Sequence, residues 1–150
     1  MKTRSDAMPL NLTMNISTVA LALIALPAFA GDIVRGKVLF KDCRACHSVI
    51  DETETVILRG GRTGPNLYGV VGRHAGSVPN FPYSTSMVAA GRNGLRWNEE
   101  DFVVYVKDAT SFLRAYLGDD TARGKMAYKL RDTAKARDVW AYLESVTNAP

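Results

Sequence analysis

The chain has 150 residues, with 19 Lys and Arg against 15 Asp and Glu, and its net charge at pH 7 is therefore +4. It has no run of Lys and Arg of the kind that grips nucleic acid, no internal repeat and no low-complexity segment. These features exclude a basic nucleic-acid-binding segment and a repeat architecture, and the length fits one small domain.

Residues 1–30 have the features of an export signal. Lys2 and Arg4 supply positive charge, an apolar run follows at residues 19–26, and Ala28 to Ala30 form a small-x-small cleavage site. We expect cleavage after Ala30, which places the mature domain in the periplasm. The alternative is an uncleaved anchor, although the apolar run is far shorter than the roughly 20 residues that a membrane-spanning helix needs.

The mature domain, residues 31–150, is mildly basic. Removal of the leader takes away two cations and one anion, so the net charge falls from +4 to +3. Translation can start at Met1, Met8 or Met14, and the sequence does not decide between them. Because the periplasm is oxidising, any reactive thiols of the domain must be kept reduced until they are used.

The first mature element is predicted to be a short helix over residues 32–41. Asp32 is a suitable N-cap, and Ile33, Gly36 and Phe40 fall on one stripe at helical spacing. A glycine in mid-helix costs about 1 kcal/mol relative to alanine. The position of Gly36 therefore predicts the close approach of a second helix.

Cys43, Cys46 and His47 form a C-x-x-C-H motif directly after this helix. A bare C-x-x-C is shared by thioredoxin-like redox sites, zinc half-sites and incidental buried cysteines, but the adjoining histidine is typical of c-type haem attachment. Two thiols three residues apart lie on one face, so that each can add to one vinyl group of the same porphyrin while the imidazole reaches the iron. The chain has two cysteines in all, which excludes a four-cysteine zinc site.

The middle of the chain is rich in turns. A Gly-rich loop is expected at residues 59–64, a short helix at 84–90 that is ended by Gly91, and a further helix that begins after Asn98 with three acidic residues at 99–101. No convincing pair of alternating strands is visible. The predicted fold class is all-α, with long loops of the kind needed to wrap a flat cofactor.

A final helix is predicted over residues 132–147. Val139, Tyr142, Leu143 and Val146 are spaced at i, i+3, i+4 and i+7, and Trp140 widens their apolar face. We expect this helix to be the partner that approaches Gly36.

Over nearly all of residues 31–147 the chain resembles the class I cytochromes c, especially the longer bacterial members of the c-two type. The matching features are the attachment motif, the contacts of the two terminal helices, the run Thr63 to Arg73, and Gly124-Lys125-Met126. The resemblance implies the class I cytochrome c fold, with the N- and C-terminal helices packed together and loops wrapped around one covalently attached haem c.

The resemblance also implies a set of site residues. Cys43 and Cys46 would form the thioethers, His47 and Met126 would be the axial iron ligands, and the carbonyl of Pro65 would accept a hydrogen bond from His47. Further residues would contact the haem: Tyr83, Trp97 and Arg73 at a propionate, and Tyr105 in the pocket.

Several of these residues have simpler interpretations. Met126 can be core filler, with Met87 as the other mature methionine, and Trp97 and Tyr105 can simply pack in the core. His74 has no ligand context and is expected to be solvated. The chain departs from the family pattern by the extra residues 113–123. It departs again at Gly124, where many relatives have a hydroxyl residue, and at Met87, where many have asparagine.

The function implied is that of a soluble monomeric carrier of single electrons, not an enzyme, with no small-molecule substrate. The donor would be a quinol–cytochrome c reductase and the acceptor a photosynthetic reaction centre or a cytochrome c oxidase. Cations around the haem edge would dock these complexes transiently: Lys41, Arg44, Arg123, Lys125 and Lys129. The rival functions are a thiol–disulfide oxidoreductase, which lacks the expected βαβ context, and a haem-based gas sensor or peroxidase-like enzyme with a displaceable methionine.

Overall fold

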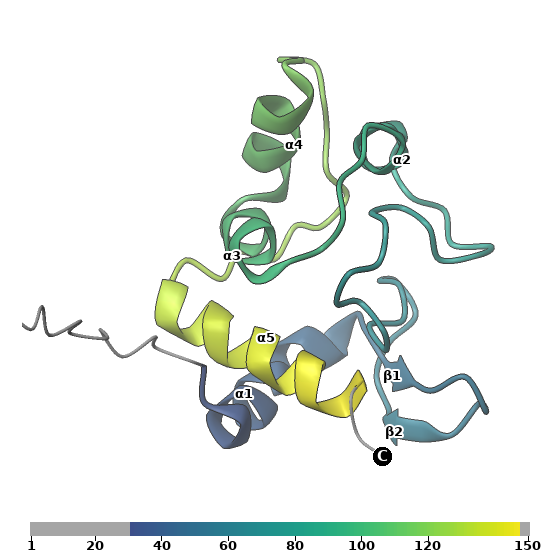
Figure 1. Cartoon of the computed structure of the whole chain (residues 1–150), viewed down its shortest axis with the longest axis vertical. Coiled ribbons are helices and arrows are strands. Elements are labelled where there is room, and N and C mark those ends of the chain that lie inside the picture. The colour runs from purple at the N-terminus through teal and green to yellow at the C-terminus, as the bar shows by residue number, and fades with distance from the viewer. Residues whose placement is uncertain (1–30, 148–150) are drawn as a thin grey trace, which may run out of the picture.

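The part of the chain that this computed structural model describes is residues 31–147, and it consists of short helices, one small hairpin and long loops (Figure 1). The proposed leader and its cleavage site lie outside the described residues. The elements in chain order are α1 (Ile33–Leu39), the 3-10 helix η1 (Phe40–Ala45), β1 (Val49–Ile50), β2 (Val56–Leu58), α2 (Thr85–Arg92), α3 (Glu99–Lys107), α4 (Ala109–Leu117) and α5 (Thr133–Thr147). Within residues 31–147, no helix has the length and apolar character needed to cross a membrane.

The two terminal helices cross at Gly36, as the sequence predicted. A Cβ atom at Gly36 would collide with the backbone carbonyl of Asp138 and would come within 3.0 Å of the Cβ of Tyr142. The rings of Phe40 and Tyr142 pack beside this crossing, with centroids 5.4 Å apart. The absent side chain of Gly36 therefore allows α1 and α5 to approach closely, and this approach outweighs the cost of a mid-helix glycine.

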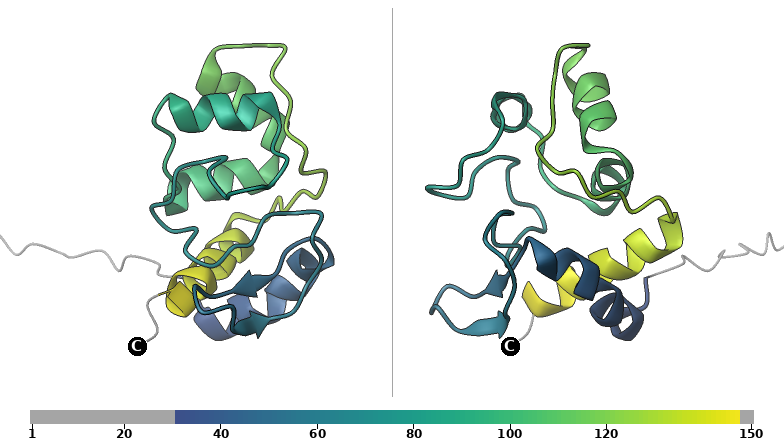
Figure 2. Two further views of the ribbon diagram at one scale, coloured as in Figure 1. Left: turned by 90° about the vertical axis from the view of Figure 1, so that its right-hand side faces the viewer. Right: turned by 180° about the vertical axis from the view of Figure 1, so that it is seen from behind.

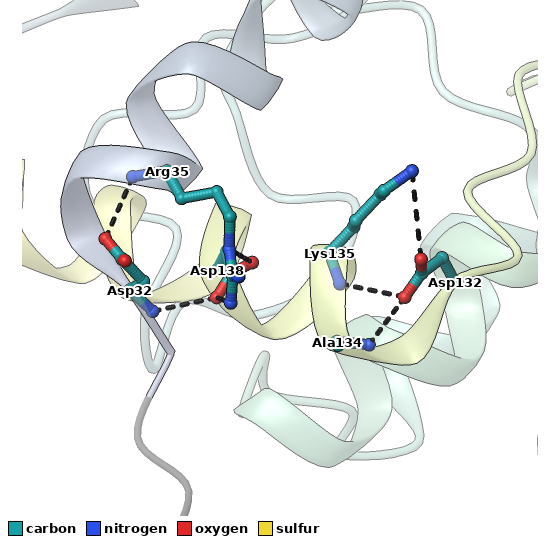
Figure 3. A network of polar contacts seen from close by, with 6 residues as sticks. All are labelled: Asp32, Arg35, Asp132, Ala134, Lys135 and Asp138. Atoms are coloured by element: carbon teal, nitrogen blue, oxygen red, sulfur yellow. Dashed lines mark hydrogen bonds and ion pairs between the residues drawn. The ribbon is translucent and has the colours of Figure 1, made fainter.

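A buried carboxylate fastens the same crossing (Figure 3). Asp138 is only 2% exposed, and its carboxylate accepts hydrogen bonds from Arg35 Nε at 2.5 Å, Arg35 Nη2 at 3.0 Å and the backbone N–H of Asp32 at 2.8 Å. The hydrogen bond from Arg35 holds the pKa of Asp138 below its ordinary value of 3.8, against the opposing effect of burial. The start of α1 is thus tied to the middle of α5 by groups 103 and 106 residues apart in the chain.

The hairpin of β1 and β2 was not predicted, and here the expectation that no strand pair exists was wrong. Val49 pairs with Leu58 and Ile50 with Val56, with an irregularity between them. The side chain of Asp51 accepts hydrogen bonds from the backbone N–H groups of Thr53 and Thr55 and so sets the turn. Strands of two and three residues are too short to show an alternating pattern, which is why the sequence did not reveal them.

The central helices also correct the sequence boundaries. Gly91 does not end α2 but lies inside it, where a Cβ would collide with the carbonyl of Ala75. α4, which was not predicted, begins after Asp108, whose side chain accepts from the N–H of Ser111, and it ends at Gly118 in the left-handed conformation. The extra residues 113–123 therefore contain the last half of a helix and the loop that follows it.

The elements form two groups with a cavity between them. α1, η1, α5 and the hairpin lie at one end of the molecule, and α2, α3 and α4 lie at the other (Figures 1 and 2). α3 joins the two groups because it packs against both α4 and α5. Aromatic contacts line this join, with ring centroids 5.2 Å apart for Phe102 and Trp140. The fold is helical with few strands, so the predicted fold class is confirmed.

The Asp138 contact generates a prediction about stability and pH. Replacing Asp138 by Asn removes an ionised acceptor of three hydrogen bonds, so it should lower the free energy of unfolding at pH 7 by about 1–3 kcal/mol. Because the folded pKa of Asp138 is lowered, its contribution is complete above the unfolded value near 3.8 and disappears as the pH falls through the folded value. Urea denaturation at pH 7 and at pH 3 measures both effects.

Asp132→Asn is the matched control for this prediction. Asp132 lies directly before α5, six residues before Asp138, and its side chain accepts from the N–H groups of Ala134 and Lys135 in the first turn (Figure 3). Asparagine caps helices about as well as aspartate, so this variant should lose only a few tenths of a kcal/mol. Equal losses in the two variants, or a loss in Asp138→Asn that persists undiminished at pH 3, would contradict the assigned role of the buried carboxylate.

Candidate functional site

The cavity between the two groups of elements has a volume of about 540 Å³. Its wall is mostly apolar, with contributions from Phe40, Leu67, Val70, Phe102, Val106 and Val139. Every site residue that the sequence analysis named also lies on this wall: Cys43, Cys46, His47, Pro65, Arg73, Tyr83, Trp97, Tyr105 and Met126. Residues that are up to 83 positions apart in the chain, from Cys43 to Met126, are thereby brought to one site.

The attachment motif is placed by η1, which continues directly from α1. A 3-10 helix has three residues per turn, so residues three apart lie above one another. The carbonyl of Cys43 accepts from the N–H groups of Cys46 at 3.1 Å and His47 at 2.9 Å, which folds the motif into one tight turn. The crossing of the terminal helices therefore fixes where both thiols and the imidazole enter the cavity.

The ring of His47 is held in one orientation. Its Nδ1 lies 2.8 Å from the carbonyl oxygen of Pro65, and a carbonyl can only accept, so Nδ1 carries the proton. Burial lowers the pKa of His47, and the Pro65 hydrogen bond opposes this effect without reversing it. The ring is therefore neutral and has a free lone pair on Nε2. A Cβ at Gly64 would collide with this ring, so glycine is required beside it.

The loop that carries Pro65 is itself clamped. Arg73 donates from Nη1 to the carbonyl of Tyr68 at 2.8 Å and from Nη2 to the carbonyl of Asn66 at 3.0 Å. The side chain of Asn66 exchanges hydrogen bonds with the backbone N–H and carbonyl of Ile50 in the hairpin. Burial lowers the pKa of Arg73, and within residues 31–147 no carboxylate forms an ion pair with it. A cation on the cavity wall without such a partner suits an anionic group inside the cavity.

The cavity wall also carries aromatic residues and both methionines of residues 31–147. Trp97 and Tyr105 pack edge to face with centroids 4.9 Å apart, and Tyr83 packs in the same manner on Phe81 at 4.7 Å. Burial, with a smaller contribution from Tyr83, raises the pKa of Tyr105 to about 12, so its hydroxyl remains a proton donor. Met87 also reaches the cavity wall, which the sequence analysis did not expect.

Two exposed residues on the cavity wall, Asp42 and Tyr128, were not among the predicted site residues. Tyr128 is 42% exposed; partial burial raises the pKa of its phenol, and the charges of Asp42 and Cys43 add to this. Asp42 and Tyr128 each lie within two positions of a predicted site residue, Cys43 and Met126, and this proximity was the available signal. The attachment motif and the methionine segment therefore meet at one rim.

Most of the cations expected at this rim already have partners. Lys125 Nζ donates to the carbonyl of Pro82 at 2.6 Å, and Lys129 Nζ pairs with Asp108 at 2.5 Å. Arg44 Nε donates to a backbone carbonyl, that of Arg59, at 3.0 Å. These contacts leave the side chains exposed, so their charge still faces solvent.

The chemistry of the site does not suit thiol–disulfide exchange. Burial, with smaller contributions from Asp42 and Cys46, raises the pKa of the Cys43 thiol to about 11. A redox-active C-x-x-C motif needs the opposite shift, toward a stable thiolate. An apolar cavity that presents two thiols, a neutral imidazole, a thioether and an uncompensated guanidinium fits a flat apolar cofactor with an iron centre and acidic substituents.

The comparisons with known proteins agree with this chemistry. Cytochrome c2 from Rhodobacter capsulatus is 47% identical over 137 residues, which cover 91% of this chain and 98% of that protein. Cytochrome c-551 from Roseobacter denitrificans is 48% identical over 132 residues, which cover 87% and 93%. The solved structure of cytochrome c2 from Rhodobacter sphaeroides superposes with a TM-score of 0.77 at 48% identity, covering 80% of this chain and 99% of that one.

No protein-family model matches the chain, so the assignment depends on these relatives. Cytochromes c2 carry one covalently attached haem c and are electron carriers, not enzymes. The predicted family, cofactor and non-enzymatic class are thereby confirmed. Sequence identity over nearly the whole length, the shared fold and the composition of the cavity lead to one conclusion: this chain belongs to the cytochromes c2, which are bacterial class I cytochromes c.

Proposed function

We propose that this cytochrome c2 shuttles single electrons between membrane-bound redox complexes in the periplasm, with its iron held by His47 and Met126. The observation that carries the proposal is the convergence of both residues, together with Cys43 and Cys46, on one apolar cavity. When bound, the haem supplies reversible one-electron exchange between ferric and ferrous iron. The residues of the chain then determine its orientation, its potential and its access to partners.

The two proposed axial ligands differ in how they are held. The carbonyl of Pro65 accepts a hydrogen bond from the Nδ1–H of His47, so the lone pair on Nε2 is free to bind the iron. The same hydrogen bond raises the basicity of the imidazole as a ligand. Met126 offers a soft thioether, which favours ferrous iron and raises the reduction potential. With His47 and Met126 both bound to the iron, the protein would leave no coordination site open to a substrate, as an electron carrier requires.

Arg73, Tyr83 and Trp97 are proposed to hold a haem propionate. All three reach the cavity wall, and the charge of Arg73 acts on Tyr83, which places those two groups near each other. A guanidinium and two N–H or O–H donors are the groups that a buried carboxylate needs. The carbonyl contacts of Arg73 use one N–H of each terminal nitrogen and leave others for the propionate.

Export of the chain is proposed on the strength of its first 30 residues. Cleavage after Ala30 would leave residues 31–150, and the solved relative from Rhodobacter sphaeroides covers 80% of this chain, which is the share that these residues make up. Gly31, the first residue after the proposed cleavage site, packs against α5 so closely that a Cβ there would collide with the carbonyl of Arg137.

The proposed electron donor is a quinol–cytochrome c reductase, and the proposed acceptor is a photosynthetic reaction centre or a cytochrome c oxidase. Docking would be transient and electrostatic, through the basic residues near the cavity mouth. The meeting of the attachment motif and the methionine segment at one rim supports this proposal, because cations of both segments then surround the same opening.

The covalent haem gives the first test of the proposed site. The purified periplasmic protein should have the mass of residues 31–150 plus one haem after denaturation, because two thioethers survive unfolding. The double variant Cys43→Ser with Cys46→Ser should release all its pigment into acidified organic solvent, while each single variant should retain it through one bond. Release of pigment from the unaltered protein would exclude the proposed attachment.

The distal ligand is tested by replacing each of the two methionines of the cavity wall in a separate variant. Met126→Ala should abolish the weak far-red absorption of the ferric protein that reports iron–sulfur ligation, and should lower the reduction potential. Met87→Leu is the matched control, since Met87 is 6% exposed on the same wall, and it should retain the band and nearly the same potential. The reverse outcome would assign the ligand to Met87.

The docking proposal predicts a rate that depends on salt. Lys41→Glu should slow electron transfer to a membrane oxidase or reaction centre severalfold at low ionic strength and only slightly at 1 M salt, where the screening length is about 3 Å. Lys41 is the suitable position because, within residues 31–147, its ammonium forms no ion pair. Second-order rates from stopped-flow absorption measure the effect.

Lys107→Glu is the control for charge reversal. Lys107 lines a separate surface groove between α3 and α4, so its reversal should leave the rate within about twofold. A rate that responds equally to both reversals would indicate an effect of net charge rather than docking at the rim, and a rate indifferent to salt would exclude electrostatic docking.

A further inference from the structure

The three residues before Met126 have contacts that neither the haem nor docking accounts for. The segment after α4 runs between α2 on one side and α3 and α4 on the other before it reaches α5, as both Figure 1 and the view from behind in Figure 2 show. Residues 123–125 lie in this passage, and each of them makes a hydrogen bond to a different part of the fold.

The contacts alternate between the two sides of the passage. The N–H of Arg123 donates to Ser86 Oγ on α2 at 3.0 Å, and the next N–H, that of Gly124, donates to Thr110 Oγ1 on α4 at 3.1 Å. Lys125 Nζ then donates to the carbonyl of Pro82, in the loop before α2, at 2.6 Å. Gly124 fits closely at this point, since a Cβ there would lie 3.0 Å from the Cβ of Ala109.

The chain is held again soon after Met126. The N–H of Leu130 donates to the carbonyl of Val106 at 2.8 Å, and Lys129 pairs with Asp108, the residue that caps α4. Residues 126–128 are therefore a short span between two fixed ends. The thioether of Met126 cannot move far from the cavity unless the hydrogen bonds on at least one side open.

We infer that Ser86, Thr110 and Lys125 are positioning residues that keep Met126 on the iron and so set how fast the sixth coordination position opens. This inference rests on the proposed ligation by Met126. It gives a role to the hydroxyl groups of Ser86 and Thr110, which accept hydrogen bonds from backbone N–H groups that lie outside any helix or strand. It also gives a role to α4, which carries Thr110 and which the extra residues help to form. A carrier needs such restraint, because an easily displaced methionine would admit small ligands.

Hydroxyl deletion tests the inference with little change of shape. Thr110→Val removes the hydroxyl that accepts from Gly124 and keeps the side-chain volume. Ser86→Ala removes the hydroxyl that accepts from Arg123 and deletes only that one oxygen atom. Loss of one neutral hydrogen bond should speed amide hydrogen exchange of Gly124 in the first variant, and of Arg123 in the second, about fivefold. Lys125→Ala should speed exchange at both amides. Exchange at Val139 and Leu143 in α5 should stay unchanged, which separates local opening from global unfolding.

Imidazole binding to the ferric protein links this motion to the ligand. At saturating imidazole the rate is limited by departure of the methionine, so each of the three variants should raise it by a factor similar to that seen in exchange. Thr85→Val and Lys107→Ala are the controls, because both residues are exposed on the neighbouring helices and make none of these contacts, and both should stay within about twofold of the unaltered rate.

The outcomes separate this inference from the proposed function. Exchange or imidazole rates that match the controls in all three variants would overturn it, as would faster exchange with an unchanged imidazole rate. Neither result would affect ligation by Met126, whose failure would appear instead as a far-red band that survives Met126→Ala. Parallel increases in both rates would establish the positioning role.

Discussion

The crossing of α1 and α5 at Gly36 is the contact on which the rest of the site depends. η1 continues directly from α1, so the angle at which the terminal helices cross decides where Cys43 and His47 point. The buried carboxylate of Asp138 fixes that crossing because it satisfies Arg35 and the backbone of Asp32 together. In this small domain with few regular elements, the α1–α5 crossing is therefore a well-fixed region, and the attachment motif follows directly from it in η1.

Side-chain hydrogen bonds hold the loops that carry the proposed ligand contacts, a role that sheets and long helices have in other folds. On the side of His47, Arg73 and Asn66 hold the loop that presents the Pro65 carbonyl. On the side of Met126, hydroxyl groups of α2 and α4 hold the segment before the methionine. Within residues 31–147, no fully buried side-chain nitrogen or oxygen lacks a hydrogen-bond partner.

Electrostatics divide the site into an apolar interior and a charged rim. Burial keeps His47 neutral and Tyr105 protonated, so the interior offers lone pairs and donors but little charge apart from Arg73. The rim carries cations such as Lys125 and Lys129, whose ammonium groups are both exposed and hydrogen-bonded. One lysine can therefore hold a loop and present positive charge to a partner at the same time.

The sequence by itself determined the attachment motif, the two terminal helices and the need for close approach at Gly36, because each of these is encoded by residues near one another in the chain. It did not reveal the hairpin, α4 or the place of Met87 on the cavity wall. Two-residue strands carry no periodic signal, and the direction of a methionine depends on the packing of its helix. The hydrogen bonds of Ser86 to Arg123 and of Thr110 to Gly124 were likewise decided only by the tertiary structure. These partners lie 37 and 14 residues apart in the chain, and they come together only when α2 and α4 pack against each other.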